Sequence, residues 1–293
     1  MTGLTQALFV IGLGVFWGVS PALNKTLGLA GVPVSVILVA SGFGVGLGLI
    51  ILQRLAGERI KLGWPEVLYG FGCAVLINVP WGIGLAAIRH VPVTLSAVVT
   101  STTPLWTFVL ALALGRERFS GLRLLALVVG LISCVVVIVT RPDARLSGVN
   151  WWVLVTAALP LLYAGYNIYT SAAWPKGMSS RTAGVVESLA SGVICLPLLL
   201  WTGPVGAAAP TVQATGYLLL FAVIVMWIAE RVCYFSMIQH LGSVSTVQAV
   251  YVATPAAVLF GFALFGETIN LWLLLGLVLL MMSLWLNNRA VPP

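Results

Sequence analysis

Apolar residues follow one another in long stretches along almost the whole chain, and charges or clusters of Gly, Pro and Asn separate these stretches. A bilayer core about 30 Å thick is crossed by roughly 20 residues of helix, and the stretches have about that length. Continuous apolar runs favour helices, because the strands of a membrane barrel alternate over about ten residues. The pattern predicts an all-α integral membrane protein with ten transmembrane helices, near 4–24, 32–54, 65–88, 93–114, 121–140, 151–171, 181–201, 214–238, 245–265 and 270–287.

Composition and length confine the function to the membrane. Of the 293 residues, 60% are hydrophobic and 7% are charged, whereas about a quarter of the residues of a soluble domain are charged. Ten spans of about 20 residues use about 200 residues, which leaves no room for a soluble catalytic domain. Cys73, Cys134, Cys195 and Cys233 each lie inside an apolar run without CxxC or Cys/His spacing, so we expect no disulfide, no metal and no cofactor.

The net charge of +7 is a topology signal. It does not indicate nucleic acid as a partner, because the basic residues flank apolar runs and form no basic stripe with interleaved aromatic residues. The side of the bilayer that holds the amino terminus collects Arg54, Arg59, Lys61, Arg116, Arg118, Arg123, Lys176, Arg181 and Arg289, and the other side collects Lys25, Arg89, Arg141 and Arg145. The positive-inside rule then predicts a multi-pass protein of the cell (inner) membrane with both termini in the cytoplasm.

The chain contains an internal repeat. The segment HVPVTLSAVVTSTTPLWTFVLALALGRE begins at His90, and HLGSVSTVQAVYVATPAAVLFGFALFGE begins at His240, 150 positions later. In each segment a proline stands eleven residues before a glycine, and a glutamate follows that glycine at once or one residue later. We therefore expect two five-helix repeats, 1–145 and 146–293. Five is an odd number of spans, so the two copies must be inserted with opposite orientation, as in transporters that bind substrate between inverted halves.

Two motifs of the repeat and one at the end of the first span resemble the drug/metabolite transporter superfamily, in its ten-helix type built of two EamA-like units. The residues that carry the resemblance are Phe16, Trp17 and Gly18 with Lys25, the run from Pro104 to Gly115, Arg116 and Glu117, and the run from Pro255 to Gly266 and Glu267. The resemblance implies a basket of helices around a central cavity. It also implies transport, often export, of amino acids, amphipathic amines, nucleotide-derived compounds or similar metabolites, with the amino-acid exporters as the best analogy.

Polar and aromatic side chains recur at spacings of three or four on the first, third, fourth, sixth, eighth and ninth spans, which places them on shared helix faces. Polar groups are costly in lipid, so these faces predict a central cavity walled by six spans. The expected substrate-binding residues are Trp17, Asn24, Asn78, Trp81, Thr100, Thr103, Tyr163, Tyr166, Asn167, Trp227, Glu230, Arg231, Tyr234, Gln248 and Tyr251. The alternative is that Ser and Thr bond the preceding helical turn and that the aromatic residues form the interfacial belt.

Glu187, Glu230 and Arg231 lie well inside their spans, away from the ends, and an ionisable residue near mid-helix costs roughly 3 kcal/mol unless it finds a partner or water. Arg231 is a candidate anchor for a substrate carboxylate and Glu230 for an amine, and structural pairing with neighbouring helices is the alternative. Glu187 is a candidate for proton coupling, because a carboxylate without a basic residue in its own helix can bind and release a proton. His90 and His240 stand at corresponding helix ends, where a structural role is expected.

These observations predict a secondary transporter that moves a small amphipathic metabolite, such as an amino acid or a related zwitterion or amine, by alternating access. The chain has no GxxxxGK[ST] loop for ATP. A membrane-embedded enzyme acting on a lipid or peptide and a channel are the alternatives. The chain has no HExxH and no Asp within a span, so an enzyme is not expected. A homodimer is a further candidate assembly.

Overall fold

The computed structural model describes residues 3–58, 60, 62–115, 119–139, 151–201, 210–247 and 249–289, and the regular structure in these ranges is helical. The first half of the chain contains α1 (Gly3–Leu29), α2 (Val34–Leu55), α3 (Trp64–Ala87), α4 (Val93–Thr100), α5 (Thr103–Ala113) and α6 (Gly121–Val139). The second half contains α8 (Trp151–Ala172), α9 (Ser180–Cys195), α10 (Leu198–Trp201), α11 (Pro210–Val247), α12 (Val250–Phe265) and α13 (Leu271–Arg289).

These helices form ten apolar segments, as the sequence predicts. Within the described ranges, seven segments are long and apolar enough to cross a membrane, and three shorter ones accompany them, at Leu124–Val137, Val252–Phe265 and Leu271–Leu286. The pairs α4 with α5 and α9 with α10 each make one span. The all-α prediction with ten spans is therefore confirmed.

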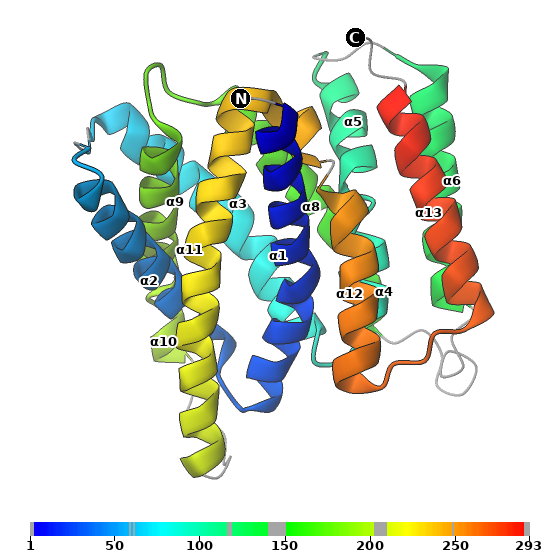
Figure 1. Cartoon of the computed structure of the whole chain (residues 1–293), viewed down its shortest axis with the longest axis horizontal. Helices are drawn as coiled ribbons and strands as arrows, with labels where there is room; N and C mark the ends of the chain where they lie inside the picture. Colours follow the sequence, from blue (N-terminus) through cyan, green and yellow to red (C-terminus); the bar gives the residue numbers. More distant parts are fainter. Residues whose placement is uncertain are drawn as a thin grey trace.

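The two halves are inserted with opposite orientation and pack against each other. Figure 1 shows α1 beginning at the same edge of the bundle at which α13 ends. Because five spans separate the start of α1 from the start of α8, α8 begins at the opposite edge. Helix α1 of the first half packs against α12 of the second half, and α2 packs against α9. Helices α6 and α13 pack against each other at one side of the bundle.

The repeated glycines end equivalent helices. Gly115 follows α5 with φ +67°, and Gly266 follows α12 with φ +61°. This left-handed backbone favours glycine, which has no Cβ to clash, and it is a common way to terminate a helix. The motif that revealed the repeat in the sequence is thus a helix stop used once in each half.

The eighth apolar segment ends at His240, close to the predicted 238, but the helix that contains it extends further. The eighth span was expected to end near 238, yet α11 continues to Val247, and α12 begins at Val250. The corresponding place in the first half is interrupted, because α3 ends at Ala87 and Pro92 stands immediately before α4. Proline has no N–H to donate, whereas the second copy carries Gly242 at the equivalent position. Helix α11 therefore continues through the position at which the first half has a break between α3 and α4.

Helices α2 and α9 approach until their backbones touch. A Cβ added to Gly42 would clash with the backbone of Gly192 and would lie 3.0 Å from the carbonyl oxygen of Ser188. Small residues allow such close packing of helices in membranes. The contact draws Glu187, one residue before Ser188, toward the interior of the bundle.

We expect Gly42→Val to lower the free energy of unfolding by about 2–3 kcal/mol, because overpacking a fixed backbone contact forces the two helices apart. The measurement is thermal unfolding of the purified protein in detergent. Gly165→Val is the matched control, since nothing lies within 4 Å of a Cβ added to this helical glycine. Equal unfolding temperatures for the two variants would contradict the assignment of this contact.

Candidate functional site

A cavity of about 300 Å³ lies between the two halves. Its walls come from α1, α2, α3, α4, α5, α8, α9, α11 and α12, and none of its described lining residues is on α6 or α13. The predicted six walls are therefore present, and α2 and α9 add two more. A volume of this size is at the small end of ligand pockets, which suits a small metabolite.

The cavity brings together most of the residues expected to bind substrate. The lining includes Trp17, Asn24, Asn78, Trp81, Thr100, Thr103, Tyr163, Tyr166, Asn167, Trp227, Glu230, Arg231 and Tyr234, together with Glu187. Gln248 and the side chain of Tyr251 lie outside the described part of the chain. Substrate binding by these residues stays a prediction, but their convergence on one space is now a structural fact.

Arg231 is held between two carboxylates. Its Nη1 lies 3.0 Å from Oε1 of Glu187 on α9, and its Nε lies 3.5 Å from Oε2 of Glu230, the preceding residue on α11. Tyr166 on α8 donates its hydroxyl to Oε2 of Glu187 at 2.7 Å and accepts from Nη1 of Arg231 at 3.3 Å. This charged cluster of Glu187, Glu230, Arg231 and Tyr166 joins three helices of the second half.

The two carboxylates of the charged cluster have different environments. Both oxygens of Glu187 are engaged by partners, and its side chain is 1% exposed. Glu230 receives one short hydrogen bond, from the indole Nε1 of Trp17 on α1 at 2.8 Å, and its second oxygen has the longer contact with Arg231. Glu187 is therefore the fixed counter-ion of Arg231, whereas Glu230 is the more replaceable partner.

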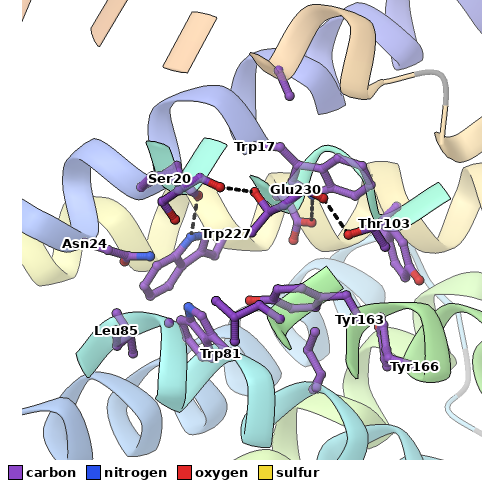
Figure 2. Close-up of a pocket in the computed structure, with 18 of the residues that line it drawn as sticks. Trp17, Ser20, Asn24, Trp81, Leu85, Thr103, Tyr163, Tyr166, Trp227 and Glu230 are labelled. Carbon is purple, nitrogen blue, oxygen red and sulfur yellow. Dashed lines mark hydrogen bonds between the residues drawn. The ribbon is translucent and has the colours of Figure 1, made fainter. Parts of the chain in front are cut away.

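Aromatic rings surround the charged cluster. Trp227 donates to the hydroxyl of Ser20 at 3.3 Å and packs edge to face against Trp81, with ring centroids 5.0 Å apart. Tyr234 stacks on Tyr166 at 5.9 Å. In Figure 2, Trp17, Trp227 and Glu230 lie on one side of the space, and Trp81 and Tyr163 face them. The site thus combines a compact set of charges with broad apolar walls, which is the usual construction of a small-molecule pocket.

In the part of the chain that the structure describes, the charged residues that line the cavity all come from the second half. By the 150-residue offset between His90 and His240, the first-half counterpart of Arg231 is Trp81 and that of Glu187 is Ile37. The first half contributes Trp17 to the charged cluster and otherwise presents hydroxyl, amide and apolar side chains to the cavity. A bound molecule therefore meets charge on the second-half side and mainly neutral groups on the other.

Several lining residues were not predicted. Ser41 on α2 and Ser188 and Ser191 on α9 line the cavity, and so does Ser101, just after α4, whose hydroxyl forms a hydrogen bond with Thr254 of the predicted α12 face. A signal for the serines was present in the chain, because Ala-Ser-Gly occurs at 40–42 and again at 190–192, with the same offset as the two histidines. The histidines themselves do not line the cavity, since His90 stacks on Trp152 and His240 bonds the Ser236 carbonyl.

A second polar network joins α1, α4 and the end of α12 at the edge where α1 ends. The Glu267 carboxylate, just beyond α12, accepts hydrogen bonds from the backbone N–H groups of Val93 at 2.7 Å and Thr94 at 2.9 Å, which are the first residues of α4. Lys25 on α1 pairs with the same carboxylate at 3.1 Å, and its ammonium lies 4.6 Å from the Phe265 ring centroid. This Glu267 cap connects three helices drawn from both halves.

Comparison with known proteins assigns the architecture to a family. The EamA-like transporter family model matches the chain twice, at residues 4–139 and 150–289. The uncharacterized inner membrane transporter YedA, from Escherichia coli strains K12 and O157:H7, is 27% identical over 282 residues, which is 94% of this chain and 88% of YedA. A crystal structure with 17% sequence identity covers 98% of both chains with a TM-score of 0.65, which shows that the fold is shared.

The matched regions account for nearly all of the chain, and they coincide with its ten apolar segments. The similarity to an inner membrane transporter and the long spans identify a multi-pass protein of the inner membrane that carries a small molecule and is not an enzyme. The location of both termini in the cytoplasm and a homodimer stay predictions. Through these two matches, the chain belongs to the EamA-like transporter family.

Proposed function

We propose that the protein is a secondary transporter for a small amphipathic metabolite that carries an amino group, such as an amino acid or a related zwitterion or amine. Transport would follow alternating access, and export is the direction that analogy with related families suggests. The observation that supports this proposal is the cavity between inverted halves, in which Glu187, Arg231 and Glu230 lie beside aromatic walls.

The charge of the site favours an amino group. The site holds two carboxyl groups against one guanidinium, so acidic groups are in excess, and Coulomb attraction is strong where water is scarce. Because Glu187 is already occupied by Arg231 and Tyr166, Glu230 is the carboxylate that an ammonium group can approach. The rings of Trp17 and Tyr234, whose centroids lie 6.1 Å apart, add cation–π attraction near the same place.

A carboxylate on the substrate has a place as well. Guanidinium groups carry five N–H donors, and the contacts of Arg231 within the described part of the chain use Nη1 and Nε. The Nη2 group can therefore donate a hydrogen bond to one oxygen of a substrate carboxylate. Amino acids fit this arrangement with the ammonium group at Glu230 and the carboxylate at Arg231, and a simple amine would use the first contact alone.

The test is counterflow in liposomes that contain the purified protein. Vesicles preloaded with an unlabelled L-amino acid or primary amine should take up the labelled compound with saturable kinetics, and the internal compound should accelerate uptake. Empty liposomes and the Arg231→Ala variant are the controls. Flux that rises linearly with concentration and shows no acceleration would identify a channel and would overturn the carrier proposal.

Proton coupling through Glu187 is a separate prediction that the same liposomes test. If Glu187 exchanges a proton during the cycle, an inward proton gradient should drive uphill export of the substrate, and Glu187→Gln should abolish that drive while exchange at equal pH persists. Both oxygens of Glu187 already have partners, so proton binding there requires the Arg231 contact to loosen. If the proton gradient still drives uphill export in the Glu187→Gln variant, Glu187 does not couple proton movement to transport.

A further inference from the structure

One part of the cavity wall, along α3 and α8, is mainly apolar apart from Asn78 and contains a glycine that packing does not require. Six lining residues make up this apolar subsite, namely Ile77, Trp81, Gly84, Leu85 and Ile88 on α3 and the loop that follows it, and Leu159 on α8. Leu85, Ile88 and Leu159 are each at most 3% exposed. Figure 2 shows Trp81 and Leu85 on the side of the cavity that faces α1, across the space from Ser20.

Gly84 leaves space in this subsite. A Cβ added to it would lie 3.6 Å from Cδ1 of Leu159 and 3.9 Å from the Tyr163 hydroxyl, which are ordinary contacts. Gly42, which also lines the cavity, differs because a Cβ there would clash with the α9 backbone. Glycine inside a helix costs roughly 0.5–1 kcal/mol relative to alanine. Neither close packing nor a left-handed backbone requires a glycine at position 84. The absence of a side chain there leaves space in the cavity, and this space calls for an explanation.

The apolar subsite lies within reach of a molecule held at the charged cluster. Tyr163, beside Gly84, is three residues from Tyr166 on α8, a rise of about 4.5 Å along the helix. Trp81, at the other edge, contacts Trp227, which is three residues before Glu230 on α11. A ligand with an ammonium group at Glu230 would therefore place an attached apolar group between Trp81, Leu159 and Tyr163.

We propose that Gly84 is a specificity-determining residue, and that the space above it receives the apolar group of the substrate. The side chain at position 84 then sets the largest apolar group that fits, which makes the preferred substrate an amine or amino acid with a bulky hydrophobic group. This inference rests on the proposed function, because it assumes that the amino group is held at Glu230. It adds a size limit that the charged cluster cannot impose.

The experiment measures ligand binding to purified protein in detergent by thermal shift, since a ligand that binds the folded state raises its unfolding temperature. The probes are ethylamine with 2-phenylethylamine, and L-alanine with L-phenylalanine. The wild-type protein should bind each phenyl compound at least about tenfold more tightly than its small partner, because burial of a ring is favourable. Gly84→Leu should remove most of that preference, and Gly84→Ala should give an intermediate preference.

Gly82→Ala is the matched control, because it adds the same methyl group to the same helix near Leu38 and outside the cavity lining. It should leave every affinity unchanged. A phenyl preference that survives in both Gly84 variants, or that Gly82→Ala removes equally, would overturn the inference and leave the proposed function intact. If Gly84→Leu does not fold, Gly84→Ala decides alone. Failure of the wild-type protein to bind any of the four probes would overturn the proposed function, and the inference with it.

Discussion

Glu230→Gln is expected to reduce transport of an amino-bearing substrate at least about tenfold while the unfolding temperature changes little. Gln keeps an oxygen that can accept the Trp17 hydrogen bond, and Arg231 keeps its contact with Glu187. The variant removes the negative charge that attracts the ammonium group. A hydrogen bond to a charged group contributes about 1.5–3 kcal/mol, which corresponds to roughly 10-fold to 100-fold in affinity.

Glu187→Gln should have the opposite pattern. Its carboxylate is 1% exposed and lies 3.0 Å from Arg231, and removal of one partner from a buried ion pair is expected to cost about 3 kcal/mol or more. The unfolding temperature in detergent should therefore fall clearly. Counterflow in liposomes and thermal unfolding, measured on both variants, separate the two roles. If Glu230→Gln transports at the wild-type rate, or if it is the variant that unfolds early, the assignment of Glu230 to the substrate and Glu187 to Arg231 is incorrect.

Much of the architecture follows from simple physical constraints. The bilayer sets the length of each apolar segment, so the ten helices can be predicted from hydrophobicity alone. The glycines at 115 and 266 could be predicted as equivalent helix stops, because the repeat places them at matching positions. Membership of the cavity wall was predictable for α1, α3, α4, α8, α11 and α12, since polar faces at helical spacing avoid lipid.

Contacts between distant segments could not be predicted in the same way. Glu187 shares no periodic pattern with Arg231, which lies 44 positions later on another helix, so their pairing depends on how α9 packs against α11. The serines of α2 and α9 belong to a repeated Ala-Ser-Gly motif, but the motif does not show what they face, and they line the cavity where the two helices touch at Gly42. The extent of α11 was also missed, because the absence of a proline at 242 decides it.

The distribution of these features suggests how the inverted repeat is used. Charge recognition is assigned to the second half, and the first half supplies space and apolar surface beside Gly84. A substrate that needs both kinds of contact would bridge the halves, and movement of one half against the other would then expose it to one side of the membrane at a time. The Glu267 cap lies where such movement must break contacts, because it joins α1 and α4 of the first half to α12 of the second.

Glu267→Ala is accordingly expected to destabilise this end of the bundle by about 3 kcal/mol. Two backbone N–H groups at the start of α4 lose their acceptor, and unsatisfied buried donors cost about 1–3 kcal/mol. The loss of a negative charge at a helix amino terminus adds to this, because the aligned peptide dipoles favour an anion there. The expected results are a lower unfolding temperature and easier entry of a reagent into the cavity from this edge.

The entry of a reagent can be measured with Ser96→Cys, because this position lies on α4 beyond Thr94 and lines the cavity. In a background without the four native cysteines, a membrane-impermeant maleimide is added on the side of the membrane where α4 begins. It should label Ser96→Cys faster when Glu267→Ala is present. Lys25→Met is the matched comparison, because it removes the 3.1 Å ion pair and leaves both backbone hydrogen bonds of the Glu267 cap intact. Lys25 is partly exposed, so its loss should cost only about 1 kcal/mol or less. Labelling and unfolding that are the same in Glu267→Ala as in the parent protein would show that the carboxylate does not hold this end closed.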